Sequence, residues 1–275
     1  MDSPDPYVLH AVTADFYSQN PQMEDNRLKT HHIEFEVTFR TILSLIPEGV
    51  KAKVSDIGGG AGPYSFALAS SGHDVTLVDL SPGLVSLAQT CASSTLAHPS
   101  RIMVGDALTL AALLPEEQRT FDIVLLLGPL YHIMSSQLRE EAVHQAWHRW
   151  AHYRDLATRE PERLARKREF YEKHAQDGDY VRRNEDGVPV HAMNHEHPSQ
   201  MPMILRRLTG VQTVKMVGVE GLLAGNLDRL VNDLQGKEFE AWAQQCMEVG
   251  LDELGWMMSD HIIGIAQKLS GNTRS

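Results

Sequence analysis

The chain has 275 residues, of which 42% are apolar, and its formal net charge at pH 7 is −11. This length and apolar content suffice for the core of one large α/β domain, or of a domain with a modest insertion. The acidic balance argues against a nucleic-acid surface, which normally carries a basic patch. We therefore expect a small-molecule partner and no nucleic acid.

The first residues, MDSPDPYVLH, lack the basic and apolar sections of a signal peptide. No stretch approaches the ~20 uninterrupted apolar residues of a membrane span. The only cysteines, Cys91 and Cys246, form neither a CxxC pair nor a disulfide framework. We therefore expect reduced thiols, a cytoplasmic location and no membrane partner; the sequence leaves a monomer and a homodimer open.

Residues 1–50 are expected to form an N-terminal helical cap. Within them, residues 8–46 have the composition of one or two helices that end in the amphipathic segment EFEVTFRTILSLI. This segment is a candidate lid over a site. Tyr17, His31 and His32 are its candidate substrate contacts, with solvated helix positions as the alternative for the two histidines.

Residues 51–135 are expected to form a ligand-binding core in which apolar runs alternate with helical stretches. This alternation is typical of a parallel sheet covered by helices. Between the runs, Pro63 and Pro82 suit the first turns of helices. The predicted strands are 53–58, 74–80, 101–107 and 121–128.

Beyond Ser135 the composition changes. Residues 136–210 are expected to form a helical and loop region that holds the substrate, with a charged helical stretch over 136–176. The segment DGDYVRRNEDGVPVHAMNHEHPSQ is predicted as loop. Residues 211–275 are expected to complete the sheet, with strands at 211–219 and 261–268 and helical material from Leu222 to Glu248 between them.

A glycine cluster, VSDIGGGAGPYSF, lies between the first predicted strand and the first predicted helix of the core. It does not match the GxGxxG of dinucleotide folds, because Pro63 or Ser65 stands at the sixth position, and it lacks the Gly-Lys-Ser/Thr of a phosphate loop. What it offers is an acid followed by alternating glycines: Asp56, Gly58, Gly60 and Gly62. At the end of the next strand, Asp79 can accept hydrogen bonds from both hydroxyls of a ribose.

Here the sequence resembles the class I S-adenosylmethionine-dependent methyltransferases, of the small-molecule, quinone-biosynthesis-like type. Four segments resemble motifs of that family in the right order: DIGGGAG, LVDLS, VGDAL and FDIVLLLGPLYHI. The resemblance implies an α/β, Rossmann-like doubly wound fold, with a mostly parallel sheet and helices on both faces. It also implies S-adenosyl-L-methionine as the cofactor.

The resemblance further implies roles for single residues. Asp56 would help to hold the amino group of the methionine portion, and Asp79 would bind the ribose. Other residues would border the methionine portion (Gly58, Gly60, Gly62, Leu127 and Gly128) or the adenine (Leu80, Asp106 and Ala107). The alternatives are a tight turn without a ligand for Asp56 and the glycines, and a helix cap for Asp106.

Methyl transfer requires alignment of nucleophile, methyl and sulfur, and acceptance of a proton where the nucleophile is a hydroxyl. Tyr131 and His132 follow the fourth predicted strand and are the candidate catalytic residues, with His132 the first choice. A histidine that only shapes the loop is the alternative. His191, His195 and His197 lie in a polar stretch with no cysteine nearby, so we expect no metal there and a solvated or substrate-facing loop.

One feature departs from the family pattern. The segment AVHQAWHRWAHYRDLATREP passes from helix to charged helix without the expected turn and fifth strand, so the fifth strand is predicted to be absent. Three hypotheses follow: an active methyltransferase for the O, N, S or C atom of a small metabolite, for instance in specialised biosynthesis; a degenerate relative that binds without turnover; and a nicotinamide-dependent oxidoreductase, which the failed GxGxxG disfavours.

Overall fold

The structure is a computed structural model of the chain. It describes residues 6–114, 121–135, 179–194, 199–208, 211–224, 227–252, 255–256 and 259–268. These residues belong to two compact units, which we describe separately: 6–135 with 179–194, and 199–268. Among the helices of the described residues, none is long and apolar enough to cross a membrane.

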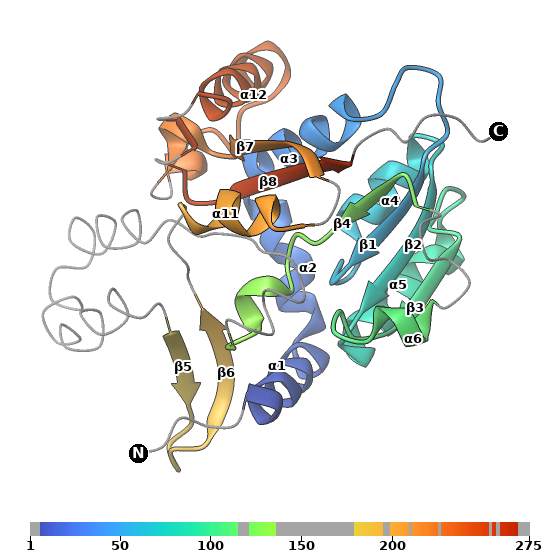
Figure 1. The fold of residues 1–275 in the computed structure, drawn as a ribbon, viewed down its shortest axis with the longest axis vertical. Coiled ribbons are helices and arrows are strands. Elements are labelled where there is room, and N and C mark those ends of the chain that lie inside the picture. Colours follow the sequence, from blue (N-terminus) through green and yellow to red (C-terminus); the bar gives the residue numbers. More distant parts are fainter. Residues whose placement is uncertain are drawn as a thin grey trace, which may run out of the picture. The chain divides into compact units, whose positions relative to one another are not determined.

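The first unit is built on a four-stranded sheet with the order β3-β2-β1-β4 (Figure 1). Its strands are β1 (Lys53–Ile57), β2 (Asp74–Asp79), β3 (Arg101–Val104) and β4 (Ile123–Leu125), and all three pairings are parallel. The connecting helices are α4 (Pro63–Ser70), α5 (Pro82–Ser94) and α6 (Leu110–Leu113). The predicted α/β, Rossmann-like class is therefore confirmed.

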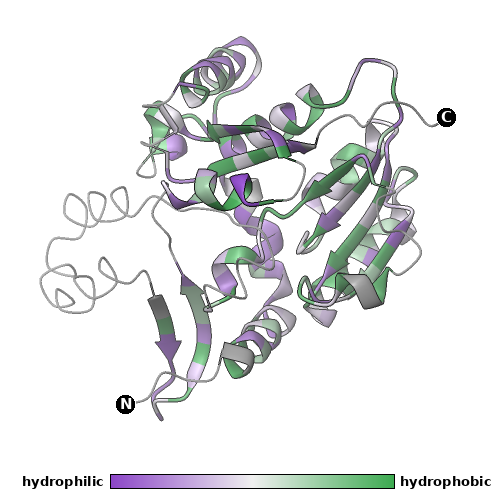
Figure 2. Ribbon diagram, in the orientation of Figure 1, coloured by the Kyte–Doolittle hydropathy of each residue, from purple (hydrophilic) through white to green (hydrophobic). Residues whose placement is uncertain are grey.

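The core of this unit lies around the two central strands. Both are buried almost throughout, as expected for parallel strands covered by helices. Figure 2 shows the apolar character of the strands. Val54 of β1 and Val75 of β2 lie in one buried cluster with Leu68 of α4 and Ile42 of the N-terminal helices, so that the cap and the sheet share a core.

The two predicted helix starts after β1 and β2 are confirmed. Gly62 precedes α4 with a φ of 89°, a left-handed conformation that favours glycine, and Pro63 follows in the first turn. Ser81 caps α5, because its hydroxyl accepts the N–H of Leu84. Pro82 again follows in the first turn.

The N-terminal segment forms three helices, so the prediction of one or two was wrong. They are α1 (Pro6–Gln19), α2 (Pro21–Thr30) and α3 (His32–Ser44). The break after α1 has a local cause: Pro21 disfavours a helical conformation of Asn20 and cannot donate a helical hydrogen bond.

A β-hairpin stands where the sequence predicted loop. It comprises β5 (Asp179–Arg183) and β6 (Pro189–Asn194), which pair antiparallel. The side-chain oxygen of Asn184 accepts the N–H groups of Asp186 and Val188 at 3.1 and 2.9 Å, and Gly187 has a φ of 78°. These turn residues close the hairpin. The polar composition of the two segments gave no strand pattern in the sequence. The hairpin belongs to the first unit, and the region 136–210 as one substrate-holding part remains a prediction.

The second unit contains α11 (Gln200–Arg206), β7 (Val211–Gly218), η3 (Gly221–Leu223), η4 (Leu227–Leu230), α12 (Gly236–Gly250) and β8 (Ile262–Lys268). β7 and β8 pair antiparallel in a two-stranded sheet of their own. The sequence analysis expected these strands to complete the parallel sheet. Among the described strands, they do not extend it. Met201 and Leu205 of α11 pack with Val214 and Met216 of β7.

Three predictions fall on residues that the structure does not describe. The absent fifth strand and the charged helical stretch concern residues within 136–178, and His195 and His197 of the metal-free loop lie in the gap at 195–198. All three remain predictions.

The contact between α1 and α5 yields a stability test. A Cβ added at Gly83 would lie 2.4 Å from the backbone oxygen of Ser18. In a free helix alanine is favoured over glycine by about 1 kcal/mol, but overpacking against a backbone atom costs ~1–3 kcal/mol. Because the obstructing atom belongs to the backbone, the cost should lie at the upper end of this range, and we expect Gly83→Ala to lower the free energy of unfolding by about 1–2 kcal/mol in urea denaturation. Ser86→Ala, at an exposed position of α5, is the control; equal stability of the two variants would contradict the α1–α5 contact.

Candidate functional site

The carboxyl ends of the four parallel strands meet at one edge of the sheet, and the predicted cofactor residues lie there. Asp56 is the last but one residue of β1 and Asp79 the last residue of β2, while Asp106 follows β3 and Gly128 follows β4. In open α/β sheets this edge is where ligands bind. The structure therefore brings together the residues that were predicted for the cofactor.

The loop after β1 has left-handed conformations at Gly58, Gly60 and Gly62, with φ of 71°, 61° and 89°. At Gly58 a Cβ would lie 2.5 Å from Pro129 Cδ, so this glycine lets the loops after β1 and β4 touch. At Gly60 a Cβ would meet only Leu84 Cδ1, at 3.9 Å. Gly60 thus leaves space at the edge that a ligand can enter.

The carboxylate of Asp79 is held by backbone groups from two loops. Its Oδ2 accepts the N–H of Gly60 and its Oδ1 the N–H of Ser81, both at 2.8 Å. Burial raises the pKa of Asp79, although these two hydrogen bonds act in the opposite direction. A carboxylate offers about four lone-pair positions, so this one can accept two further donors, as a ribose diol would supply. The site therefore fits the predicted role.

Asp56 lies beneath the glycine loop. Its side chain is 1% exposed, and its Oδ2 accepts the hydroxyl of Ser65 at 2.7 Å. A Cβ at Gly59 would come within 2.6 Å of the same oxygen. Burial raises the pKa of Asp56 to about 6. In this structure the carboxyl group supports the loop from below, and its predicted contact with the cofactor amino group remains a prediction.

Asp106 interacts with a residue that the sequence analysis did not single out. Its Oδ1 accepts the N–H of Leu108 at 2.8 Å, and its Oδ2 lies 3.2 Å from Nε2 of His10 on α1. Burial acts to raise the pKa of Asp106, but the hydrogen bonds from His10 and Leu108 outweigh it and lower the pKa. His10 carried no sequence signal, because a lone histidine on a helix has no distinctive spacing.

Helix α1 contacts the loops after three of the strands. His10 reaches Asp106 after β3, and the hydroxyls of Ser18 and Ser81 lie 2.9 Å apart after β2. Tyr17 reaches His132 in the short helix η2 (Leu130–His132) after β4. This position agrees with a lid over the edge. His31 and His32 lie at the start of α3, not on the helix that carries Tyr17.

His132 has partners at both ring nitrogens. Nδ1 donates to the carbonyl oxygen of Ala192 on β6 at 3.0 Å, so Nε2 accepts the hydroxyl of Tyr17, also at 3.0 Å. Burial lowers the pKa of His132 to about 3 and raises that of Tyr17. The imidazole is thus neutral and joins α1, η2 and the hairpin. Its predicted catalytic role remains a prediction.

Tyr131 lies against His132, with ring centroids 4.3 Å apart, and burial raises the pKa of Tyr131.

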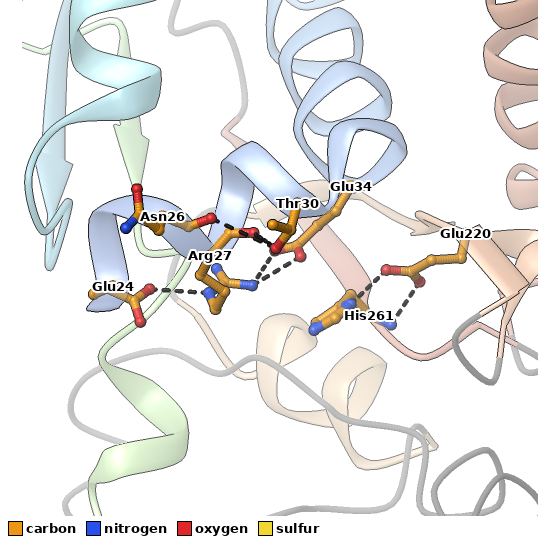
Figure 3. A network of polar contacts seen from close by, with 7 residues as sticks. All are labelled: Glu24, Asn26, Arg27, Thr30, Glu34, Glu220 and His261. Carbon is orange, nitrogen blue, oxygen red and sulfur yellow. Dashed lines mark hydrogen bonds and ion pairs between the residues drawn. The ribbon is translucent and has the colours of Figure 1, made fainter. Parts of the chain in front are cut away.

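A charged group lies in the cap. Arg27 on α2 donates to Glu24 at 2.9 Å and to both oxygens of Glu34 at 2.8 and 2.9 Å (Figure 3). This charged group of the cap had no sequence signal, because it depends on how α2 and α3 fold back on each other. In the second unit, Figure 3 also shows Glu220 accepting the backbone N–H of His261 at 2.9 Å.

His191 of the hairpin joins the aromatic cluster around Tyr17. Its ring centroid lies 4.7 Å from that of Phe16, 5.3 Å from that of His132 and 5.9 Å from that of Tyr17. The sequence placed His191 in a solvated or substrate-facing loop. The structure buries it, because β6 packs against α1.

Comparison with known families identifies the type of domain that forms this edge. Residues 54–151 match the model of a methyltransferase domain, and this range contains β2, β3, β4, all of β1 except Lys53, and the acids at the strand ends. The chain therefore contains a methyltransferase domain, for which the cofactor is S-adenosyl-L-methionine. The quinone-biosynthesis-like type remains a prediction.

Comparisons with individual proteins are more distant. An S-adenosylmethionine-dependent methyltransferase from Methanosarcina mazei is 17% identical, with 67% of this chain and 91% of that chain covered and a TM-score of 0.47. Magnesium protoporphyrin IX methyltransferase from Synechocystis PCC 6803 is 18% identical, with 78% and 92% covered and a TM-score of 0.46. WbdD is 23% identical, with 40% of this chain and only 23% of that chain covered and a TM-score of 0.29. The comparison with curated proteins found no match.

The burial of Asp56 predicts a pH-dependent stability. Because burial raises its pKa from 3.8 to about 6, the folded chain binds more protons than the unfolded chain between these values. The free energy of unfolding should therefore fall as the pH rises through this window. In Asp56→Asn there is no charge to bury, and the amide oxygen can still accept the Ser65 hydroxyl.

We expect the stability of Asp56→Asn relative to the unchanged protein to increase by about 1–2 kcal/mol between about pH 5 and about pH 7.5. Urea denaturation at the two pH values measures it. Ser65→Ala is the control, since it removes the hydrogen bond but keeps the titrating carboxyl group. A stability difference between Asp56→Asn and the unchanged protein that does not vary with pH would contradict the buried ionisation.

Proposed function

We propose that this methyltransferase acts on a small-molecule metabolite, and that the edge formed by the ends of β1 to β4 holds its cofactor. The observation that carries the proposal is the carboxylate of Asp79, which Gly60 and Ser81 hold in place while two of its acceptor positions remain. A cytoplasmic enzyme, as a monomer or homodimer, remains our expectation.

Different residues at this edge would bind different parts of the cofactor. Asp79 would accept the ribose hydroxyls, and Asp106 with the Ala107 amide would bind the adenine edge beside Leu80. The backbone of Gly60, Gly62, Leu127 and Gly128 would border the methionine portion. Bound S-adenosyl-L-methionine supplies a methyl group on a positively charged sulfur, and the acids at this edge suit that charge.

Helix α1 would cover the bound molecules, because it already contacts the loops after β2, β3 and β4. His10 occupies one oxygen of Asp106 in this structure. An adenine amino group that binds Asp106 would share that carboxylate with His10 or displace it. The lid and the cofactor would therefore be coupled through one side chain.

A second candidate is a relative that binds the cofactor without turnover. It is favoured by His132, whose two ring nitrogens are both engaged and whose pKa of about 3 makes it a weak base. Product formation against a panel of metabolites separates the two candidates, since only an active enzyme would release S-adenosylhomocysteine.

The ribose assignment is testable by calorimetric titration with S-adenosylhomocysteine. Each hydrogen bond to a charged group contributes ~1.5–3 kcal/mol, so Asp79→Ala should raise the dissociation constant by about 10²-fold or more. Asp74→Ala, at the opposite end of β2, is the matched control and should leave it within about threefold. Unchanged affinity in Asp79→Ala would remove the assignment, and no binding by the folded, unchanged protein would contradict the proposed function itself.

A further inference from the structure

One buried polar atom of the first unit stands out beside the proposed lid. His191 lies on β6 and is only 8% exposed. Its Nε2 is buried and has no hydrogen-bond partner among the residues that the structure describes. Buried polar atoms of folded proteins are nearly always paired, so an unpaired one calls for an explanation, and a catalytic role is one of them.

The position of His191 indicates which role this atom can have. Its ring touches Phe16 and Tyr17 of α1, the helix that contacts the loops after β2, β3 and β4, and it also touches His132 of η2. The short helix η2 follows β4, and α1 and β6 contact it, whereas the proposed function places the methionine portion beside the loop after β4. A group bound at Nε2 of His191 would therefore lie on the acceptor side of the site.

The two histidines of the cluster differ in what they can still bind. His132 has both nitrogens engaged, by Ala192 and by Tyr17. His191 contacts its neighbours through its ring faces and edges and keeps Nε2 for another molecule. The proton-accepting function that the sequence analysis assigned to His132 is thus better served by its neighbour.

We propose that His191 is a catalytic residue that accepts the proton of the methyl acceptor, and that this acceptor is an O–H or N–H group. The inference rests on the proposed function. The lone pair of the oxygen or nitrogen attacks the methyl carbon, and the carbon–sulfur bond breaks with its electron pair moving to sulfur. The acceptor proton passes to Nε2 of His191. A thiol that is already ionised, or a carbon acceptor, would not use this step.

Burial and one nearby positive charge keep the ring of His191 in the basic form. His191 faces Tyr17 on α1, His132 on η2 and Arg182 on β5. Burial lowers the pKa of His191, and the positive charge of Arg182 lowers it further. The imidazole is therefore neutral at physiological pH, and protonation should abolish the step only at pH below the ordinary pKa of histidine. At saturating cofactor, kcat should fall on the acid side for this reason.

The test uses the full chain, tritiated S-adenosyl-L-methionine and a panel of phenols, alcohols, amines, thiols and carbon acids. His191→Gln keeps a polar group near Nε2 but cannot take the proton, and His191→Phe keeps a planar ring beside Phe16 without any polar atom. His98→Phe is the control, because His98 lies in the loop before β3, at the other end of the sheet. The dissociation constant of S-adenosylhomocysteine is measured for every variant.

We expect transfer to O–H or N–H acceptors, with kcat lowered about 10²-fold or more in His191→Gln and further in His191→Phe. The acid limb of the kcat profile should disappear in His191→Gln. Affinity for S-adenosylhomocysteine should change less than about twofold in both variants, and His98→Phe should match the unchanged protein.

Three results would overturn the inference while leaving the cofactor site in place: undiminished kcat in His191→Phe, transfer only to thiols or carbon acids, or no transfer to any O–H or N–H acceptor by a protein that binds S-adenosylhomocysteine. Absence of that binding in the unchanged, folded protein would instead overturn the proposed function on which the inference rests.

Discussion

The first unit depends on how the glycine loop after β1 is tied to β2. The N–H of Gly58 donates to the carbonyl oxygen of Val78 at 2.7 Å, and the N–H of Gly60 donates to Asp79 at 2.8 Å. These bonds require left-handed backbone conformations that glycine adopts without strain. They place the loop beside the acid that ends β2. The ligand edge is thus formed by backbone geometry before any side chain of the cap is added.

A second layer of contacts comes from segments far apart in the chain. Tyr17 of α1, His132 of η2 and Ala192 of β6 form one line of hydrogen bonds. A helix that precedes the sheet and a hairpin that follows it are thereby joined over one strand end. Because each bond satisfies a buried polar atom, the loss of any one would leave a neighbour unpaired and loosen the contact of α1 with η2 and the hairpin.

Burial, more than charge pairing, determines the electrostatics of the site. Burial raises the pKa of Asp56 to about 6 and lowers that of His132 to about 3, so both are displaced toward their neutral forms. Arg27, by contrast, keeps its charge because Glu24 and Glu34 flank it. The interior next to the edge is therefore poor in free charge, which strengthens each hydrogen bond formed there.

The sequence by itself determined the parts of this protein that follow from local order: the four parallel strands, the two proline-started helices and the acids at the strand ends, since parallel strands place their carboxyl ends at one edge. Only the tertiary structure decided the rest. The hairpin was hidden because polar strands lack an apolar alternation, and its turn is closed by one side chain, Asn184. The pairing of β7 with β8, the His10–Asp106 contact and the burial of His191 arise between residues distant in the chain. No local pattern encodes such contacts, because they depend on which surfaces meet when the elements pack.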